Sequence, residues 1–164
     1  MANPLPYKIA CLCDLRDAQG RVLMLHRRKE PNRDLYSPIG GKLDTETGES
    51  PAQCARREIM EEAGIDVPLE RIRLVGLVSE QGYEDTTHWL MFVYRVLGPV
   101  DVEEREIREG RLEWHEPGEV VNLPLPETDR QVIWPLIEES NGAFFAVHID
   151  CRDGGIRWDV EQKG

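Results

Sequence analysis

The sequence lacks any long apolar run and is poor in basic residues. No stretch of its 164 residues reaches the roughly 20 apolar residues that a membrane-spanning helix needs, and residues 1–10 lack the charged start and apolar core of a secretion signal. Lys and Arg number 20 against 31 Asp and Glu, which gives a net charge of −11. We therefore expect a cytoplasmic protein that binds neither membranes nor nucleic acid polymers, since both are met by basic patches.

Cysteine is also scarce, and its spacing excludes a common kind of site. None of the four cysteines, at positions 11, 13, 54 and 151, forms a Cys-x-x-Cys pair, so a structural zinc site is not expected. The chain has no internal repeat, no low-complexity segment and no linker-like stretch. With 40% hydrophobic and 31% charged residues it has the composition of a globular protein, and its length predicts a single domain over residues 1–164.

Hydrophobic patterning predicts interleaved strands and helices. The expected order is strand 7–15, turn 17–20, strand 21–28, loop 31–41, helix 51–63, strand 71–79, polar connection 80–87, strand 88–97, acidic loop 101–110, strand 111–115, helix 128–140 disturbed by Pro135, and a last hairpin of 143–151 and 156–160. This order predicts an α/β (α+β) fold with a mixed sheet between helices.

The helix at 51–63 has clear signals at both ends. Ser50 can accept a hydrogen bond from the first turn, Pro51 suits the first helical position, and Gln53 completes a capping box. Gly64 suits the left-handed residue that ends many helices. Small apolar residues recur along one side at helical spacing, so this helix can pack closely on its neighbour.

Three glutamates are crowded beside that apolar stripe. Glu58 and Glu62 are four residues apart, and Glu58 and Glu61 are three apart. Like charges at these spacings destabilise a helix, and such an uncompensated conflict is typical of a functional site. Hard divalent cations prefer carboxylate oxygens and share their coordination shell with phosphates. The pattern favours a metal site that holds a phosphate chain, although an acidic helix face can also be merely solvated.

The segment from Gly41 to Ile65 resembles the Nudix box. After Glu49 come seven residues, Arg57-Glu58, an aliphatic residue, one residue, Glu61-Glu62, one residue and Gly64-Ile65, as in that family. The departure lies upstream, where seven residues instead of five separate Gly41 from Glu49, so we interpret residues 44–47 as part of a longer loop. The resemblance implies a Nudix-type α/β/α sandwich and a hydrolase.

The resemblance also implies a metal, Mg²⁺ or else Mn²⁺, and its ligands. Glu58 and Glu62 are the expected ligands, Glu61 is a ligand or a general base, and the Gly41 carbonyl helps to hold the metal. A further acidic residue from outside the box often completes such sites. In the loop at 101–110 the first candidate is Glu106 and the next is Glu104, although a charged loop is often only solvated.

Arg57 and Glu49, which lie in the same segment, are also assigned roles by the resemblance. Arg57 is grouped with Glu58 and Glu61 among the catalytic residues, although a purely structural role is equally compatible with the pattern. Glu49 is expected to organise the box by pairing with Arg57.

Candidates for substrate binding lie outside the box. Arg27 ends a strand and either meets the outer phosphates or is an ordinary surface charge. Asp129 matches the place of a polar residue that reads the purine edge in MutT-like enzymes, which destroy oxidised purine nucleoside triphosphates, but it can also cap a helix. Trp114 and Trp134 either stack on a base or fill the core, and the core is favoured.

The predicted function is Mg²⁺-dependent hydrolysis of a nucleoside diphosphate linked to another moiety. A MutT-like enzyme that converts a (d)NTP to the monophosphate and pyrophosphate is preferred. Hydrolysis of ADP-ribose, nucleotide sugars or dinucleoside polyphosphates is the alternative, and a non-catalytic nucleotide-sensing domain is the alternative of another class. The expected partner is a small nucleotide, and the protein is expected to be a monomer or a homodimer.

Overall fold

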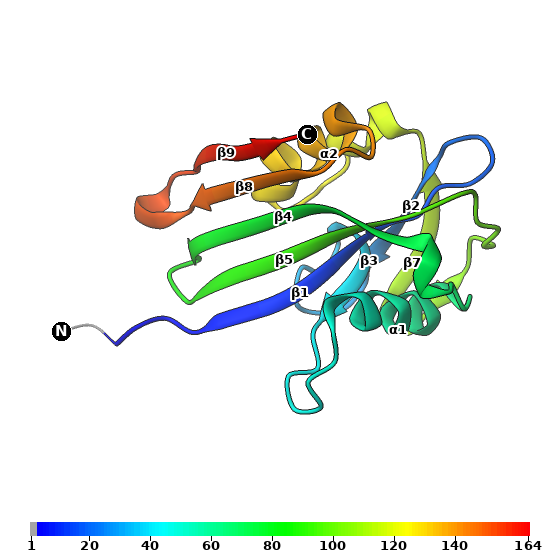
Figure 1. Ribbon diagram of the computed structural model, residues 1–164, viewed down its shortest axis with the longest axis horizontal. Coiled ribbons are helices and arrows are strands. Elements are labelled where there is room, and N and C mark those ends of the chain that lie inside the picture. Colours follow the sequence, from blue (N-terminus) through cyan, green and yellow to red (C-terminus); the bar gives the residue numbers. More distant parts are fainter. Residues whose placement is uncertain (1–2) are drawn as a thin grey trace.

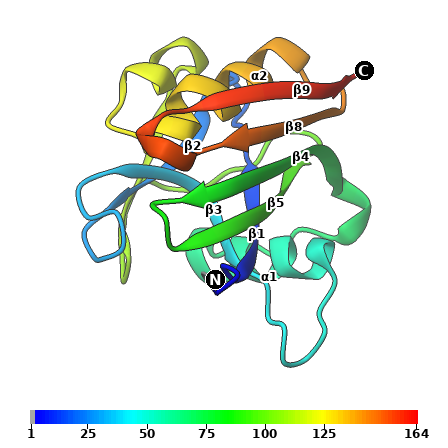
Figure 2. The same ribbon diagram turned by 90° about the vertical axis from the view of Figure 1, so that its left-hand side faces the viewer.

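The computed structural model describes residues 3–164, and strands dominate it (Figures 1 and 2). The strands are β1 (Tyr7–Asp14), β2 (Val22–Arg27), β3 (Tyr36–Lys42), β4 (Ile72–Tyr83), β5 (Thr87–Val96), β6 (Glu106–Ile107), β7 (Gly110–His115), β8 (Phe145–Asp150) and β9 (Arg157–Lys163), and the α-helices are α1 (Pro51–Ala63) and α2 (Trp134–Ser140). Short 3₁₀ turns occupy Leu69–Arg71, Pro117–Asn122 and Arg152–Gly154.

The strands form one mixed sheet. Their order is β6-β7-β2-β3-β1-β5-β4-β8-β9, with β1–β5 and β4–β8 parallel and the remaining neighbours antiparallel. β1 therefore lies in the middle, between β3 on one side and β5 on the other. This arrangement confirms the predicted mixed sheet.

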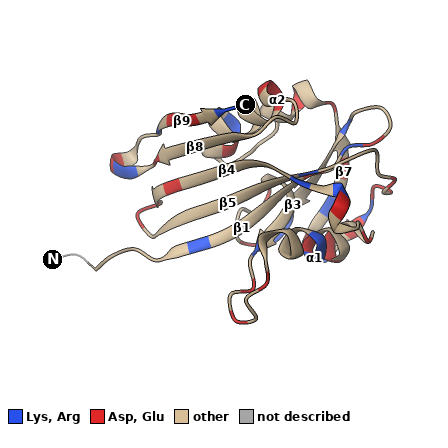
Figure 3. Ribbon diagram, in the orientation of Figure 1, with Lys and Arg blue, Asp and Glu red and all other residues tan. Residues whose placement is uncertain are grey.

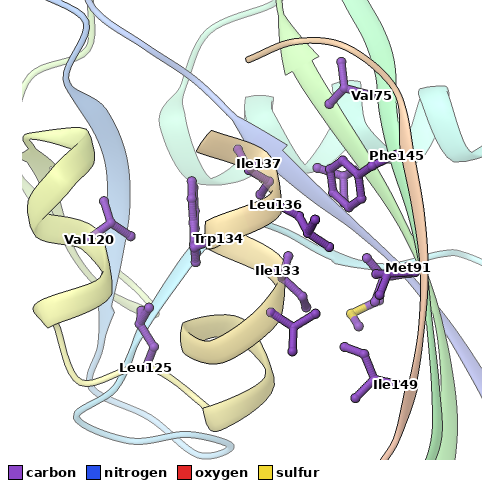
Figure 4. Packing of buried hydrophobic residues seen from close by; sticks show 14 of the residues in the cluster. Val75, Met91, Val120, Leu125, Ile133, Trp134, Leu136, Ile137, Phe145 and Ile149 are labelled. Atoms are coloured by element: carbon purple, nitrogen blue, oxygen red, sulfur yellow. The ribbon is translucent and has the colours of Figure 1, made fainter. Parts of the chain in front are cut away.

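A hydrophobic core fills each face of the sheet. On one face, Cys54, Ala55 and Ile59 of α1 are fully buried against residues of β1, β2 and β3. On the other face, Ile133, Leu136 and Ile137, in and just before α2, face Met91, Phe145 and Ile149 of β5 and β8, and Trp134 lies toward Val120 and Leu125 (Figure 4). The helices thus cover opposite faces, which confirms the α/β/α sandwich.

The loop predicted for residues 31–41 is wrong in its second half, where strand β3 lies between β1 and β2. Pro38 and the Gly40-Gly41 pair discourage a strand assignment, because neither residue type favours a strand interior. In the structure Gly40 is needed there, since a Cβ at this position would lie 2.1 Å from the Cys11 carbonyl oxygen of β1. Tertiary pairing with two strands overrides the local signal.

The last helix begins with a wide turn. Residues Asp129–Ile133 are π-helical and run directly into α2, and the Trp134 N–H donates to the Asp129 carbonyl. Pro135 follows at once, which agrees with the predicted disturbance, because proline removes a backbone donor. Among residues 3–164, neither this helix nor α1 is long and apolar enough to span a membrane.

Candidate active site

Helix α1 is capped as its sequence predicts. The Ser50 hydroxyl accepts from the Gln53 N–H at 3.1 Å, and the Gln53 side chain accepts from the Ser50 N–H at 2.9 Å. Gly64 ends the helix with φ 75°. Both ends of the helix are therefore set locally, and the three glutamates are held in a known rotational order about its axis.

Arg57 organises the carboxylates on this helix, and Figure 3 shows how closely charges of both signs lie along it. Its guanidinium contacts Glu49 at 2.6 Å, Glu58 at 2.9 Å and Glu61 at 3.4 Å. The hydrogen bond from Arg57 lowers the pKa of Glu49 to about 2. The predicted pairing of Arg57 with Glu49 is confirmed, and the same arginine also positions Glu58.

Glu62 is the most deeply buried of the three glutamates, with only 5% of the residue exposed. Its Oε1 accepts from the Gly40 N–H at 2.8 Å. Burial raises the pKa of Glu62 to about 8, and the nearby charge of Glu58 acts in the same direction. Burial likewise raises the pKa of Glu58. These two carboxyls resist ionisation together because Arg57 neutralises their negative charge only in part.

The glycine pair of β3 lets this strand approach α1 closely. A Cβ on Gly41 would lie 2.5 Å from Oε1 of Glu58. The longer loop does not disturb the contact, because residues 44–49 close on themselves: the Asp44 N–H donates to Glu49 at 2.9 Å. The loop that holds the extra residues extends away from α1 (Figure 1).

The donor set fits a hard divalent cation. It consists of carboxylate oxygens, and two of these carboxyls have raised pKa values that a cation would lower. Among residues 3–164, no three acidic, His or Cys side chains already converge on one point. Arg57 instead holds Glu58 and the Gly40 amide holds Glu62, so a cation would compete with these contacts.

The acidic loop contributes a residue that the sequence did not single out. Glu109, in the turn between β6 and β7, is the residue of this loop whose charge raises the pKa of both Glu58 and Glu62. Glu106 is half exposed and pairs with Arg28 at 2.9 Å, and Glu104 accepts from the Trp114 N–H at 3.0 Å. The metal-binding role of Glu106 stays a prediction.

A cavity of about 300 Å³, which we call the central cavity, begins at the glycine pair. Its lining includes Arg27, Gly40, Gly41, Glu80, Trp89 and Asp129. Arg27 is half buried and donates to the Pro31 carbonyl oxygen at 2.7 Å. The volume is at the lower end of the range for small-molecule sites.

Two carboxyls lie in the lining of the central cavity. Asp129 starts the π-helical turn, which forms no side-chain cap, so the predicted alternative of a helix cap is not seen. Glu80 lies on β4, although residues 80–87 were predicted as a connection. It is 4% exposed and its Oε2 has no hydrogen-bond partner. Burial raises the pKa of each carboxyl to about 7.

Aromatic residues divide between core and cavity. Trp134 is 1% exposed and belongs to the core, as predicted, and Trp114 donates to the Val102 carbonyl oxygen at 2.8 Å. Trp89 lines the central cavity and pairs in register with Glu80, so both side chains lie on the same face of the sheet. The cavity position of Trp89 could not be predicted from the sequence, because residues of a strand alternate between faces and nothing local marks the side of the cavity.

Comparison with known proteins identifies relatives of this chain. A family model described as the NUDIX domain matches residues 6–137. An uncharacterized Nudix hydrolase, YvcI, from Bacillus subtilis is 29% identical over 114 residues, which is 69% of each chain. A dihydroneopterin triphosphate diphosphatase from Escherichia coli is 38% identical over 68 residues, which is 42% of this chain and 43% of that protein.

A solved structure shows the same fold. The crystal structure of a MutT protein from Bacillus halodurans matches 96% of this chain and 99% of its own, with a TM-score of 0.75 and 23% sequence identity. At that identity the similarity concerns the arrangement of the elements and not the substrate.

Proposed function

The chain belongs to the Nudix family of hydrolases, and from this premise we propose that it cleaves a nucleoside triphosphate to the monophosphate and pyrophosphate with the help of Mg²⁺. One observation carries the proposal: a single cavity runs from the glycine pair beside the glutamates of α1 to the two carboxyls at Glu80 and Asp129. Phosphates at the glycine pair would be held by a metal on the glutamates, and a base at the other end would find the carboxyls of Glu80 and Asp129 as hydrogen-bond partners.

Glu58, Glu61 and Glu62 would hold the metal, with the Gly41 carbonyl oxygen as a further ligand. A bound Mg²⁺ or Mn²⁺ neutralises phosphate oxygens and makes a coordinated water more acidic. Glu61 is 57% exposed on its side chain, so it is the glutamate of this group that water reaches most easily. We assign it the role of a ligand or of the base that accepts the proton of the attacking water.

The other charged residues would position these groups. Arg57 holds Glu58 and Glu61 through its guanidinium, and the Gly40 amide orients Glu62. Arg27 at the rim of the central cavity is proposed to meet the outer phosphates. Of the acidic loop we propose Glu109 as the additional acidic residue, because its charge acts on Glu58 and Glu62.

A second candidate for the substrate comes from a relative of this chain. The Escherichia coli protein that is 38% identical over 68 residues is a dihydroneopterin triphosphate diphosphatase, and the matched part is less than half of that protein. A pterin triphosphate presents the same phosphate chain on a different heterocycle. The geometry of the glutamates would serve either substrate.

A substrate panel tests the proposal. Purified protein with Mg²⁺ is given ordinary and oxidised (d)NTPs, dihydroneopterin triphosphate, ADP-ribose, a nucleotide sugar and a dinucleoside polyphosphate, and the products are separated by anion-exchange chromatography. We expect the triphosphates to be cleaved fastest, with pyrophosphate as the product and full inhibition by a chelator. Faster cleavage of ADP-ribose or of a nucleotide sugar would contradict the proposal, and nucleotide binding without turnover would support a sensing domain.

A further inference from the structure

Glu80 is an unusual residue for its surroundings. It lies on β4, on the face of the sheet whose apolar core is covered by α2. One of its carboxyl oxygens is buried without a hydrogen-bond partner. A buried polar group without a partner destabilises the folded state. Such a group in the wall of a cavity is satisfied when a ligand supplies the missing hydrogen bond.

Asp129 faces the same cavity from a different element. Its charge and that of Glu80 are coupled, because Glu80 raises the pKa of Asp129. No basic side chain of residues 3–164 contributes to the pKa of either carboxyl, and the Thr128 hydroxyl is the one group that favours ionisation of Glu80. Because the charge of Glu80 disfavours ionisation of Asp129, the two carboxyls do not readily carry two negative charges together.

The other titratable groups near Glu80 do not supply a positive charge. Tyr83 and Cys151 have raised pKa values, chiefly through burial, so both are neutral near pH 7. Arg27 and Lys42 line the same cavity, but the pKa of neither carboxyl is shifted by them. A protonated Asp129 would present one hydroxyl donor, and Glu80 presents one carboxyl oxygen that has no hydrogen-bond partner.

A particular heterocyclic edge complements such a pair. A carboxylate is best satisfied by two parallel N–H donors, and a protonated carboxyl by a carbonyl oxygen. The 2-amino-4-oxopyrimidine edge of guanine presents a carbonyl, a ring N–H and an amino group in a row, and a pterin ring has the same edge. Adenine offers a single amino donor beside a ring nitrogen acceptor, so it would leave the carboxylate incompletely satisfied.

We infer that Glu80, acting with Asp129, is a specificity-determining residue that binds the 2-amino-4-oxopyrimidine edge of a guanine or pterin ring. This inference rests on the proposed function, since it assigns the base to the end of the central cavity farthest from the glutamates of α1. Trp89 lies opposite Glu80 in the strand register and lines the same cavity, so it offers an aromatic surface beside the ring.

The first test measures kcat/KM for dGTP, dITP, dATP and a 2-amino-4-oxopteridine triphosphate with Mg²⁺. The unaltered protein should prefer dGTP or the pteridine to dATP, and dITP, which lacks the amino group, should be cleaved about tenfold more slowly than dGTP. Glu80→Met should reduce cleavage of dGTP or the pteridine about a hundredfold and change dATP less than about threefold. The favoured substrate whose kcat/KM falls more in this variant shows whether the bound ring is guanine or a pterin.

Glu127→Met is the matched control. Glu127 is exposed and pairs with Arg130 at 3.3 Å, and it does not line the central cavity. This variant should keep the substrate preference of the unaltered protein. Thermal unfolding of Glu80→Met in metal-free buffer should show equal or higher stability, because the substitution removes a buried carboxyl without a partner. If this variant fails to fold, the comparison of dGTP with dITP on the unaltered protein still decides the inference.

Binding without catalysis separates this inference from the proposed function. Calorimetric titration of GMP, IMP and AMP in metal-free buffer should show the tightest binding for GMP and a loss of that preference in Glu80→Met. A protein that shows this pattern but hydrolyses no triphosphate would refute the proposed function alone. An active protein that prefers dATP, treats dGTP and dITP alike, or keeps its preference in Glu80→Met would overturn the inference.

Discussion

The two ends of the central cavity hold their acidic residues in opposite ways. On the α1 side, Glu58 and Glu62 are already engaged, by Arg57 and by the Gly40 amide. At the far end, Glu80 has an unpartnered oxygen, and no basic residue of the described chain acts on the pKa of Glu80 or Asp129.

This difference indicates what each end still needs. Carboxylates that are oriented but insufficiently neutralised need a cation, and a phosphate chain then supplies the remaining ligands. A cavity wall that holds a carboxyl oxygen without a hydrogen-bond partner needs a ligand with hydrogen-bond donors. Charge therefore selects the phosphates at one end and hydrogen-bond geometry selects the heterocycle at the other.

The largest expected effect is at the metal end. Glu62→Gln removes a buried ligand while keeping its size, so Mg²⁺-dependent hydrolysis should fall roughly a hundredfold to a thousandfold, measured as pyrophosphate release at saturating Mg²⁺. Thermal unfolding in metal-free buffer should be unchanged or occur at a higher temperature, because the variant lacks a carboxyl whose pKa is raised by burial. Glu46→Gln in the exposed turn at 45–48 is the control. Full activity in Glu62→Gln would remove this residue from the mechanism.

A smaller effect is expected at the base end. Asp129→Ala removes a cavity carboxyl that is not among the proposed metal ligands, so it should change the ratio of kcat/KM between guanine and adenine substrates about tenfold. The rate on the poorer substrate should change much less. Glu127→Ala, two residues away and exposed, should leave the ratio unchanged. Equal losses on every base would show that Asp129 supports the fold and not the preference.

The smallest effect concerns stability and pH. Folded Glu62 has a pKa of about 8 and folded Glu80 one of about 7, both above the ordinary value of 4.5. Between about pH 4.5 and pH 8 the folded state therefore binds more protons than the unfolded state. Metal-free stability should accordingly be highest near pH 4.5 and decline as the pH rises to about 8. Thermal unfolding scanned from pH 5 to pH 9 measures this, as a fall of several degrees in the midpoint.

The two ends should respond differently to metal in the same scan. Mg²⁺ should raise the unfolding midpoint at pH 8 in the unaltered protein and in Glu80→Met, since neither lacks a metal ligand. Glu62→Gln should show little response to Mg²⁺. A midpoint that rises between pH 5 and pH 8 without metal would contradict the assignment of raised pKa values to these buried carboxyls.

Residues that act through local geometry could be predicted from the sequence. The capping box at Ser50, the left-handed Gly64 and the order of Glu58, Glu61 and Glu62 all follow from the 3.6-residue period of a single helix. Most strands were also predicted, because their apolar residues alternate over several positions. The Arg57–Glu49 pair could be inferred because both residues belong to the same short motif.

Residues that act through long-range contacts could not be predicted in this way. β3 is a strand because β1 and β2 pair with it, although its own proline and glycines disfavour one. Glu109 acts on α1 from about 50 residues away in the chain, and Glu80 meets Asp129 only when β4 and the last helix pack together. Helical periodicity alone determined the cluster of glutamates on α1, whereas the setting of the other carboxyls was decided by tertiary packing, because burial and proximity depend on which distant segments come together.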